Sequence, residues 1–122
     1  MNPVIVRPLT ISAGQSDTGI TNINGEVFVG FRITTPWATA GVSILGVSYA
    51  SDNTPEASEL GPVFNGDGEV NFANTVAMQN HMVAVELADV MHLKYIALRS
   101  GTYSTPVTQT VQQTIRVITR LG

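Results

Sequence analysis

The feature that most constrains this chain is the recurrence of apolar side chains at every second position. Within residues 26–33, Val27, Val29, Phe31 and Ile33 alternate with the residues between them. A period of two is that of a β-strand with one face toward a core. Similar patterns predict further strands at residues 4–11, 41–49, 82–87, 93–99 and 110–121, and a hairpin across residues 61–72.

Turn-forming sequences separate these segments. Residues 12–24 and 51–59 are rich in small and polar residues and are predicted to be loops. Residues 76–91 show no apolar stripe of helical period, so we expect a strand ending at Leu87 and one tight helical turn at residues 88–92. The whole chain, residues 1–122, is predicted to be a single all-β domain, an antiparallel sandwich or barrel of roughly seven or eight strands.

Composition narrows the function classes. Charged residues make up 12% of the chain, where about 25% is typical of soluble domains. A surface with so few charges is typical of a protein that is bound to a partner or to its own copies. A small β-protein rich in Ser and Thr would have the same low charged fraction. With a net charge of −3 and six Lys and Arg, we expect neither nucleic acid nor a membrane as partner. The absence of cysteine excludes disulfides and thiolate metal sites.

The chemically active residue types are sparse. His81 and His92 are the two histidines, and no Gly-x-Ser-x-Gly motif accompanies them. Asn65, Asp67 and Glu69 alternate as the ligands of a calcium loop do, but an ordinary hairpin turn explains the same residues. We therefore predict no catalytic residue, no metal site and no cofactor, and expect the protein not to be an enzyme.

Trp37 is the single tryptophan and follows Pro36 at the end of a predicted strand. Its indole could be a platform for sugar stacking or a plug at one end of the core. A sugar site commonly needs a second aromatic ring, and the tyrosines are ambiguous candidates for one. The sequence favours the plug.

Four segments together resemble the cement (decoration) proteins that coat the heads of tailed bacteriophages. Residues 37–52 have a Trp and small residues leading into a strand that ends in Ser-Asp. Residues 93–102 carry a Tyr-Ile strand and an Arg-Ser-Gly turn, residues 106–109 read Pro-Val-Thr-Gln, and residues 115–120 form an Ile-rich end with a final Arg. The order and spacing of these pieces are similar to the family pattern over about two-thirds of the chain.

The resemblance implies a jelly-roll-like antiparallel β-sandwich that binds the outer surface of a phage capsid. In that role it would stabilise the particle by bridging subunits of the major capsid protein, commonly as a homodimer or homotrimer. The implied location is the virion, assembled in the bacterial host cytoplasm. Residues 1–11 contain no apolar run suited to a signal peptide, which agrees with this location.

The first segment is the predicted contact with a partner. Because proline cannot donate to a sheet ladder, this part of the chain is expected to be either an extended arm over residues 1–8 or an edge strand protected by its prolines. An arm can join a partner's sheet by β-augmentation. The predicted interface residues are Asn2, Pro3, Val4, Ile5, Val6, Arg7 and Pro8.

Two other functions share the jelly-roll architecture, so the fold alone does not separate them. One is a carbohydrate-binding or tail- and fibre-associated module, which needs an exposed aromatic platform. The other is an enzyme of the cupin type, which needs several histidines and a carboxylate at metal spacing. With two histidines in the chain, the cupin alternative is the weaker.

Overall fold

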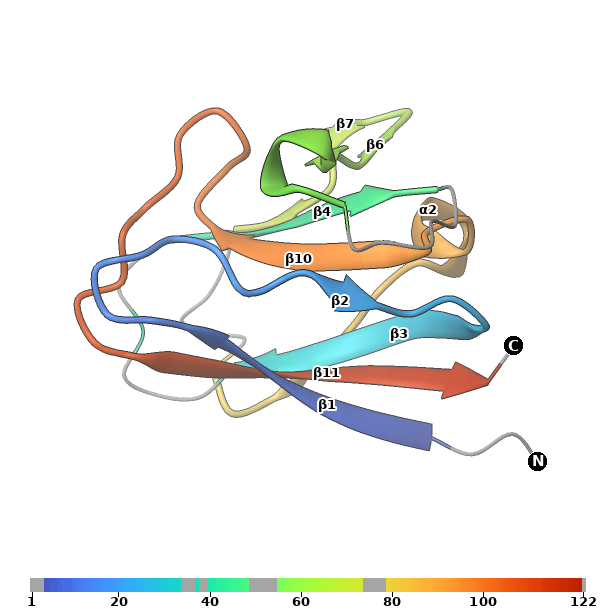
Figure 1. Cartoon of the computed structure of the whole chain (residues 1–122), viewed down its shortest axis with the longest axis horizontal. Coiled ribbons are helices and arrows are strands. Elements are labelled where there is room, and N and C mark those ends of the chain that lie inside the picture. Colours follow the sequence, from blue (N-terminus) through green and yellow to red (C-terminus); the bar gives the residue numbers. More distant parts are fainter. Residues whose placement is uncertain (1–3, 34–36, 38–39, 49–54, 74–78, 122) are drawn as a thin grey trace.

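The computed structural model describes residues 4–33, 37, 40–48, 55–73 and 79–121. They form two main sheets that face each other (Figure 1). The strands are β1 (Val4–Ile11), β2 (Thr21–Asn22), β3 (Glu26–Ile33), β4 (Val42–Val47), β5 (Gly61–Pro62), β6 (Phe64–Asn65), β7 (Gly68–Glu69), β8 (Asn71–Phe72), β9 (Met82–Ala84), β10 (Tyr95–Ser100) and β11 (Gln113–Leu121). The described helical elements are a 3-10 turn, η1 (Ala57–Glu59), and a four-residue helix, α2 (Leu87–Val90). No helix in this part of the chain is long and apolar enough to cross a bilayer.

The strand pairings confirm the predicted all-β sandwich. Sheet A has the order β1–β11–β3–β9, and sheet B has the order β2–β10–β4–β5, with β8 also paired to β4. Strands β6 and β7 form the predicted hairpin. The pairings of the described strands are antiparallel. The finer expectation of jelly-roll connectivity stays a prediction.

The core lies between the two sheets because both contribute alternating apolar side chains. Ile115 and Val117 of β11 meet Ile96 and Leu98 of β10 in one cluster, and all four are fully buried. Each such side chain contributes about 1.5–3 kcal/mol relative to an exposed position. The largest fully buried apolar side chains are Phe28, Phe31, Ile11, Ile23, Ile33, Ile44, Ile96, Leu98, Ile115, Val42 and Val90.

Strand β3 departs from the strict alternation that its sequence predicts. A bulge shifts its pairing with β11, so that Phe28 lies opposite Thr119 and is fully buried in the core. Phe31 and Ile33 face the core beyond the bulge. The prediction that Val27 shares their face is therefore wrong, because one extra residue in a strand exchanges its two faces.

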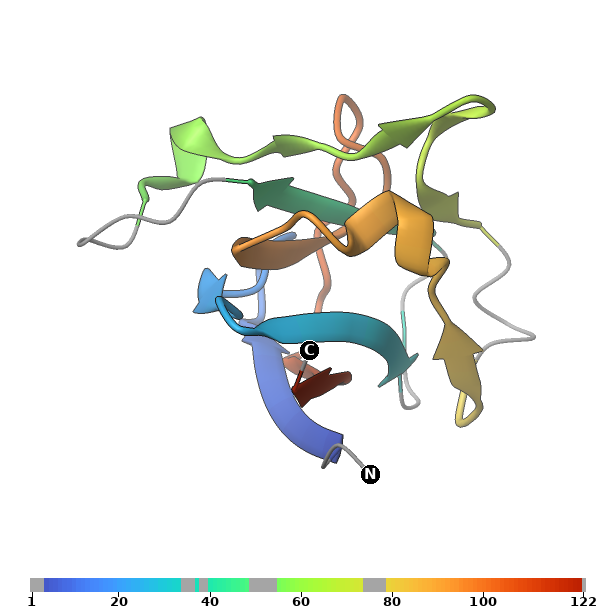
Figure 2. The ribbon, with the colours of Figure 1, turned by 90° about the vertical axis from the view of Figure 1, so that its right-hand side faces the viewer.

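Sheet B is buried on both faces. Its inner face belongs to the main core, and its outer face carries a second apolar cluster. That cluster consists of Leu45, Val47, Leu60, Tyr95 and Ala97, with Ile20 packed against it. Leu60 follows η1, and Figure 2 shows the segment from η1 to β7 passing outside β4. This cover explains why β4 reads as a nearly continuous apolar run.

Three local predictions are wrong. The strand expected to end at Leu87 ends at Ala84, because Leu87 begins α2 and its carbonyl accepts the Met91 N–H. Leu87 is consequently exposed. The strand expected to begin at residue 110 begins at Gln113, so Val111 precedes it and is exposed. Strand β2 lies inside a predicted loop, where it pairs with β10 and is too short to show a period.

Arg7 and Glu26 form a partly buried ion pair on the side of sheet A that faces the core. The Arg7 Nε donates to Glu26 Oε1 at 3.0 Å, and the Arg7 Nη2 donates to Oε2. The Thr119 hydroxyl donates to Oε1 at 2.6 Å. The hydrogen bonds from Arg7, together with that from Thr119 and the Arg7 charge, lower the pKa of Glu26 against the opposing effect of burial.

This geometry predicts an acid-sensitive contribution to stability. Because the folded-state pKa of Glu26 lies below its unfolded value, the contribution is complete above the unfolded pKa and is lost as the pH falls through the folded pKa. Glu26→Gln should lower the free energy of unfolding near neutral pH by about 1–3 kcal/mol. The difference from the parent protein should shrink below about pH 4. Urea denaturation near neutral pH and near pH 3 measures both quantities.

Glu56→Gln is the matched control, because it neutralises an exposed carboxylate by the same substitution. It should change the free energy of unfolding little at either pH. An equal loss of stability for Glu26→Gln at both pH values would contradict the prediction.

Candidate functional site

The predicted interface segment lies at an edge of sheet A. Val4 to Pro8 belong to β1, whose neighbour in sheet A is β11. Asn2 and Pro3 lie outside the described residues. Val4 and Val6 are 63% and 52% exposed. The described part of the segment is thus an edge strand, where a proline is tolerated. Its contact with a partner stays a prediction.

Pro8 is exposed on the same side as Val4 and Val6, whereas Ile5 and Arg7 point to the opposite side. Ile5 and Arg7 are half-buried, in register with Leu9 and Ile11, which are core residues. Arg7 is bound to Glu26. Val4, Val6 and the surface beside them are therefore the accessible part of the predicted interface, and Ile5 and Arg7 serve the fold.

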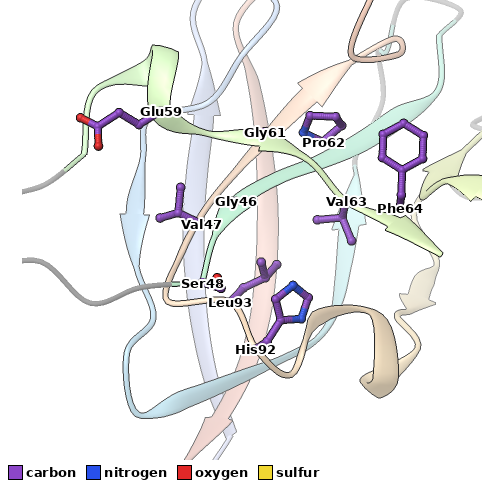
Figure 3. Close-up of a pocket in the computed structure, with 10 residues that line it drawn as sticks. All are labelled: Gly46, Val47, Ser48, Glu59, Gly61, Pro62, Val63, Phe64, His92 and Leu93. Atoms are coloured by element: carbon purple, nitrogen blue, oxygen red, sulfur yellow. The ribbon is translucent and has the colours of Figure 1, made fainter.

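An open pocket of about 360 Å³ lies where β4, β5 and the turn after α2 meet (Figure 3). Its volume is at the lower end of the range of small-molecule sites, about 300–1,000 Å³. It is lined by Gly46, Val47, Ser48, Glu59, Gly61, Pro62, Val63, Phe64, His92 and Leu93. In Figure 3 the Glu59 carboxylate is directed away from the His92 ring, so these two titratable groups do not converge on one point.

The pocket places a hydroxyl and an imidazole on the same lining. Ser48 comes from the end of β4 and His92 from the turn after α2. A histidine activates a hydroxyl within hydrogen-bond reach, about 2.6–3.2 Å, and no such bond joins Ser48 to His92 among the described side chains. Glu59 accepts the backbone N–H of Glu56 at 3.1 Å, which ties it to its own loop.

Trp37 is a core residue. It is 8% exposed and belongs to the main apolar cluster. Its Nε1 donates to the Ala40 carbonyl at 3.3 Å, which satisfies its one polar group. The prediction of a plug is confirmed, and Trp37 is withdrawn as a sugar platform. Phe64, which the sequence did not single out, is instead the exposed aromatic ring beside the pocket, at 63% exposure.

Asn65, Asp67 and Glu69, which alternate as calcium ligands do, make hydrogen bonds within the fold. The Asn65 Oδ1 accepts the Asp67 N–H at 2.8 Å, which closes the hairpin turn. The Glu69 carboxylate accepts the Ser43 hydroxyl at 2.8 Å and the Tyr103 N–H at 3.1 Å. In the described ranges, no group of three or more His, Cys, Asp or Glu is arranged to hold a metal ion.

The two histidines lie at opposite ends of the segment that contains β9 and α2. His81 precedes β9, and His92 follows α2. Both are exposed. Neither is placed in a cluster with other metal-ligating side chains of the described residues.

Comparison of the chain with protein-family models, with curated proteins and with solved structures finds no match. The fold is therefore established by the structure itself, and the function is argued from the residues.

Proposed function

We propose that this protein is a structural cement protein that binds the outer surface of a phage capsid and stabilises it by bridging major capsid protein subunits. Its place is the virion, where it acts without catalysis and associates with its own copies. The resemblance of the chain's middle and C-terminal segments to decoration proteins first suggested this function.

The observation that carries the proposal is the exposed apolar edge at β1. Val4 and Val6 are the most exposed valines of the described residues, and they lie on a strand with one open edge. An open edge can pair with a partner's backbone, and flanking apolar side chains add buried area. These are features of a surface that is covered in use.

The architecture supports an adhesive role. Sheet B is buried on both faces and sheet A on one, so a rigid scaffold presents the edge strand. On a repetitive particle, several modest contacts of this kind add up by multivalency. A binder that gains affinity in this way needs no deep cleft.

Carbohydrate binding remains the second candidate because of one observation. Phe64 is exposed beside the open pocket, with Pro62 and His92 on the same lining. An exposed ring is the stacking platform that such a site needs. The two functions therefore place their contacts on different surfaces, β1 for the capsid and Phe64 for a glycan.

The deciding experiment uses phage heads made with and without the gene for this chain. Purified protein should co-sediment with heads that lack it and should raise the temperature at which they release DNA. Heads that are equally stable with and without the protein, or that fail to bind it, would refute the proposed function.

Variants locate the contact. Val4→Lys combined with Val6→Lys should weaken co-sedimentation by at least about tenfold, since a charge on an edge strand opposes pairing. Phe64→Lys places the same charge at an equally exposed apolar position and should leave head binding unchanged. Loss of binding with Phe64→Lys alone, accompanied by loss of glycan retention, would favour the carbohydrate-binding module.

A further inference from the structure

Three of the six cationic residues share the outer face of sheet A. Arg32 in β3 lies directly opposite Arg116 in β11, and Arg120 follows on the same strand. All three are exposed, while residues next to them, such as Phe31 and Val117, are buried in the core. Alternation along the strands therefore directs the three guanidinium groups away from the sandwich. We call this surface the arginine face.

The arginine face lacks a countercharge of its own. Among the described residues, the outward positions of β1, β11, β3 and β9 include no Asp or Glu. The two ion pairs found among the described residues are formed by Arg7 and Arg99, not by Arg32, Arg116 or Arg120. Like charges directly opposite each other in a sheet are destabilising. Arg32 and Arg116 thus carry an electrostatic cost that an anionic partner would remove.

An acidic hollow begins where the arginine face ends. Ala84 of β9 pairs with Gly30 of sheet A and also lines a second hollow of about 360 Å³. The carboxylates around this hollow are Asp67, Glu69, Glu86 and Asp89. Figure 2 shows the chain running from β9 into α2, and residues of this segment, Ala84, Glu86 and Asp89, line the hollow.

Part of this acidic hollow is free to meet cations. Glu69 is held by Ser43 and Tyr103, and Asp89 accepts a hydrogen bond from Asn65 at 3.2 Å. Asp67 and Glu86 are exposed and form no ion pair with the described residues. Apolar side chains contribute on both surfaces, with Phe72 in the hollow and Met82 beside Arg32. The two surfaces are therefore complementary in charge.

We propose that this chain forms a two-fold symmetric homodimer in which the arginine face of each copy lies against the acidic hollow of the other. A two-fold interface needs two complementary patches side by side on one surface, because each residue pair then occurs twice. The meeting of the two surfaces at β9 provides that arrangement. Guanidinium groups suit this role because they bind carboxylates through two parallel hydrogen bonds.

The net charge of −3 per copy does not oppose such a dimer. At about 0.1 M salt, charges farther apart than about 10 Å are largely screened, whereas contacting pairs are screened much less. The inference rests on the self-association in the proposed function and names the surfaces that meet. Dimerisation is measured on the free protein, so a missing dimer and a failure to bind phage heads are distinguishable results.

Sedimentation equilibrium over a range of protein and salt concentrations tests the dimer. The parent protein should dimerise, and rising salt should dissociate it. The variant Arg32→Glu with Arg116→Glu, and the variant Asp67→Arg with Glu86→Arg, should each weaken the dimer by at least about tenfold. Mixing the two variants should restore dimerisation, because the reversed charges then meet each other at one contact and the native charges meet at the other. Glu56→Arg, an exposed acidic position outside the hollow, is the matched control and should have no effect.

Three outcomes would overturn the proposal. A parent protein that stays monomeric up to millimolar concentration has no such dimer. A dimer that is insensitive to salt and to both double variants uses another surface. Binding of the monomer to anionic vesicles or to an unrelated acidic protein, lost with Arg32→Glu and Arg116→Glu, would assign the arginine face to a different occupant. Circular dichroism and thermal melting confirm that each variant is folded.

Discussion

Phe31→Ala should lower the free energy of unfolding by about 3–5 kcal/mol, which is the usual cost of truncating a fully buried phenylalanine. The Phe31 ring is completely buried between the sheets and meets the Phe72 ring edge-on, with centroids 5.2 Å apart. Its removal leaves a cavity and also ends the aromatic contact. Since domains of this size are stable by about 5–15 kcal/mol, the variant should be near its unfolding threshold. Thermal melting should show a decrease of about 10–20 °C.

Phe64→Ala is the matched control, because it truncates the same side chain where it is exposed. It should change stability by no more than about 0.5 kcal/mol. Comparable losses at Phe31 and Phe64 would mean that the sheets do not pack as described. The pair of variants therefore tests the core without any assay of function.

Gly101→Ala should cost about 2–5 kcal/mol, from backbone strain and steric overlap together. Gly101 has a φ of +97°, and an added Cβ would lie 2.5 Å from the Thr105 carbonyl oxygen and 2.8 Å from the Val107 nitrogen. These are backbone atoms of the following loop, so they cannot move without opening it. The Gly101 carbonyl also accepts a hydrogen bond from the Asn71 amide at 2.9 Å, and it lies 2.6 Å from the Ser43 hydroxyl, whose one proton it shares with the Glu69 carboxylate.

Two further glycines separate these causes. Gly14 has a φ of +84° but open space around it, so Gly14→Ala should show the strain alone, about 1–3 kcal/mol. Gly19 has neither a positive φ nor a close neighbour, and Gly19→Ala should be nearly neutral. Urea denaturation of the three variants should rank them in that order. A Gly101→Ala protein as stable as Gly19→Ala would contradict the loop geometry.

The long strands could be predicted from sequence because their alternation spans several residues. In β10 the alternation predicts that Ile96 and Leu98 face one side and Tyr95 and Ala97 the other, and these pairs do lie on opposite faces. The alternation could not reveal that the second face is also covered, since Leu60 comes from a distant segment. Strands of two residues, such as β5, are too short to show any period.

The candidate surfaces were only partly predictable. Prolines identified the first segment as an edge element, because a missing N–H has a direct structural consequence. The arginine face could not be predicted, because the sequence does not show the pairing register of β3 and β11. Arg32 and Arg116 are distant in the chain and lie opposite each other only through that pairing. Phe64 lies in a hairpin whose projection from the sandwich has no local sequence signal.

The pairing of β1 with β11 has a consequence for how the molecule is made. Strand β11 lies between β1 and β3, and it contributes most of the hydrogen-bonded neighbours that either strand has in sheet A. During synthesis, β1 emerges before β11, and all the residues between Ile11 and Gln113 must be made before the two strands can pair. Sheet A is therefore completed late and slowly, because contacts between residues far apart in the sequence generally form slowly. Nascent chains that stop short of Gln113 would expose unmatched ladders and be prone to aggregate.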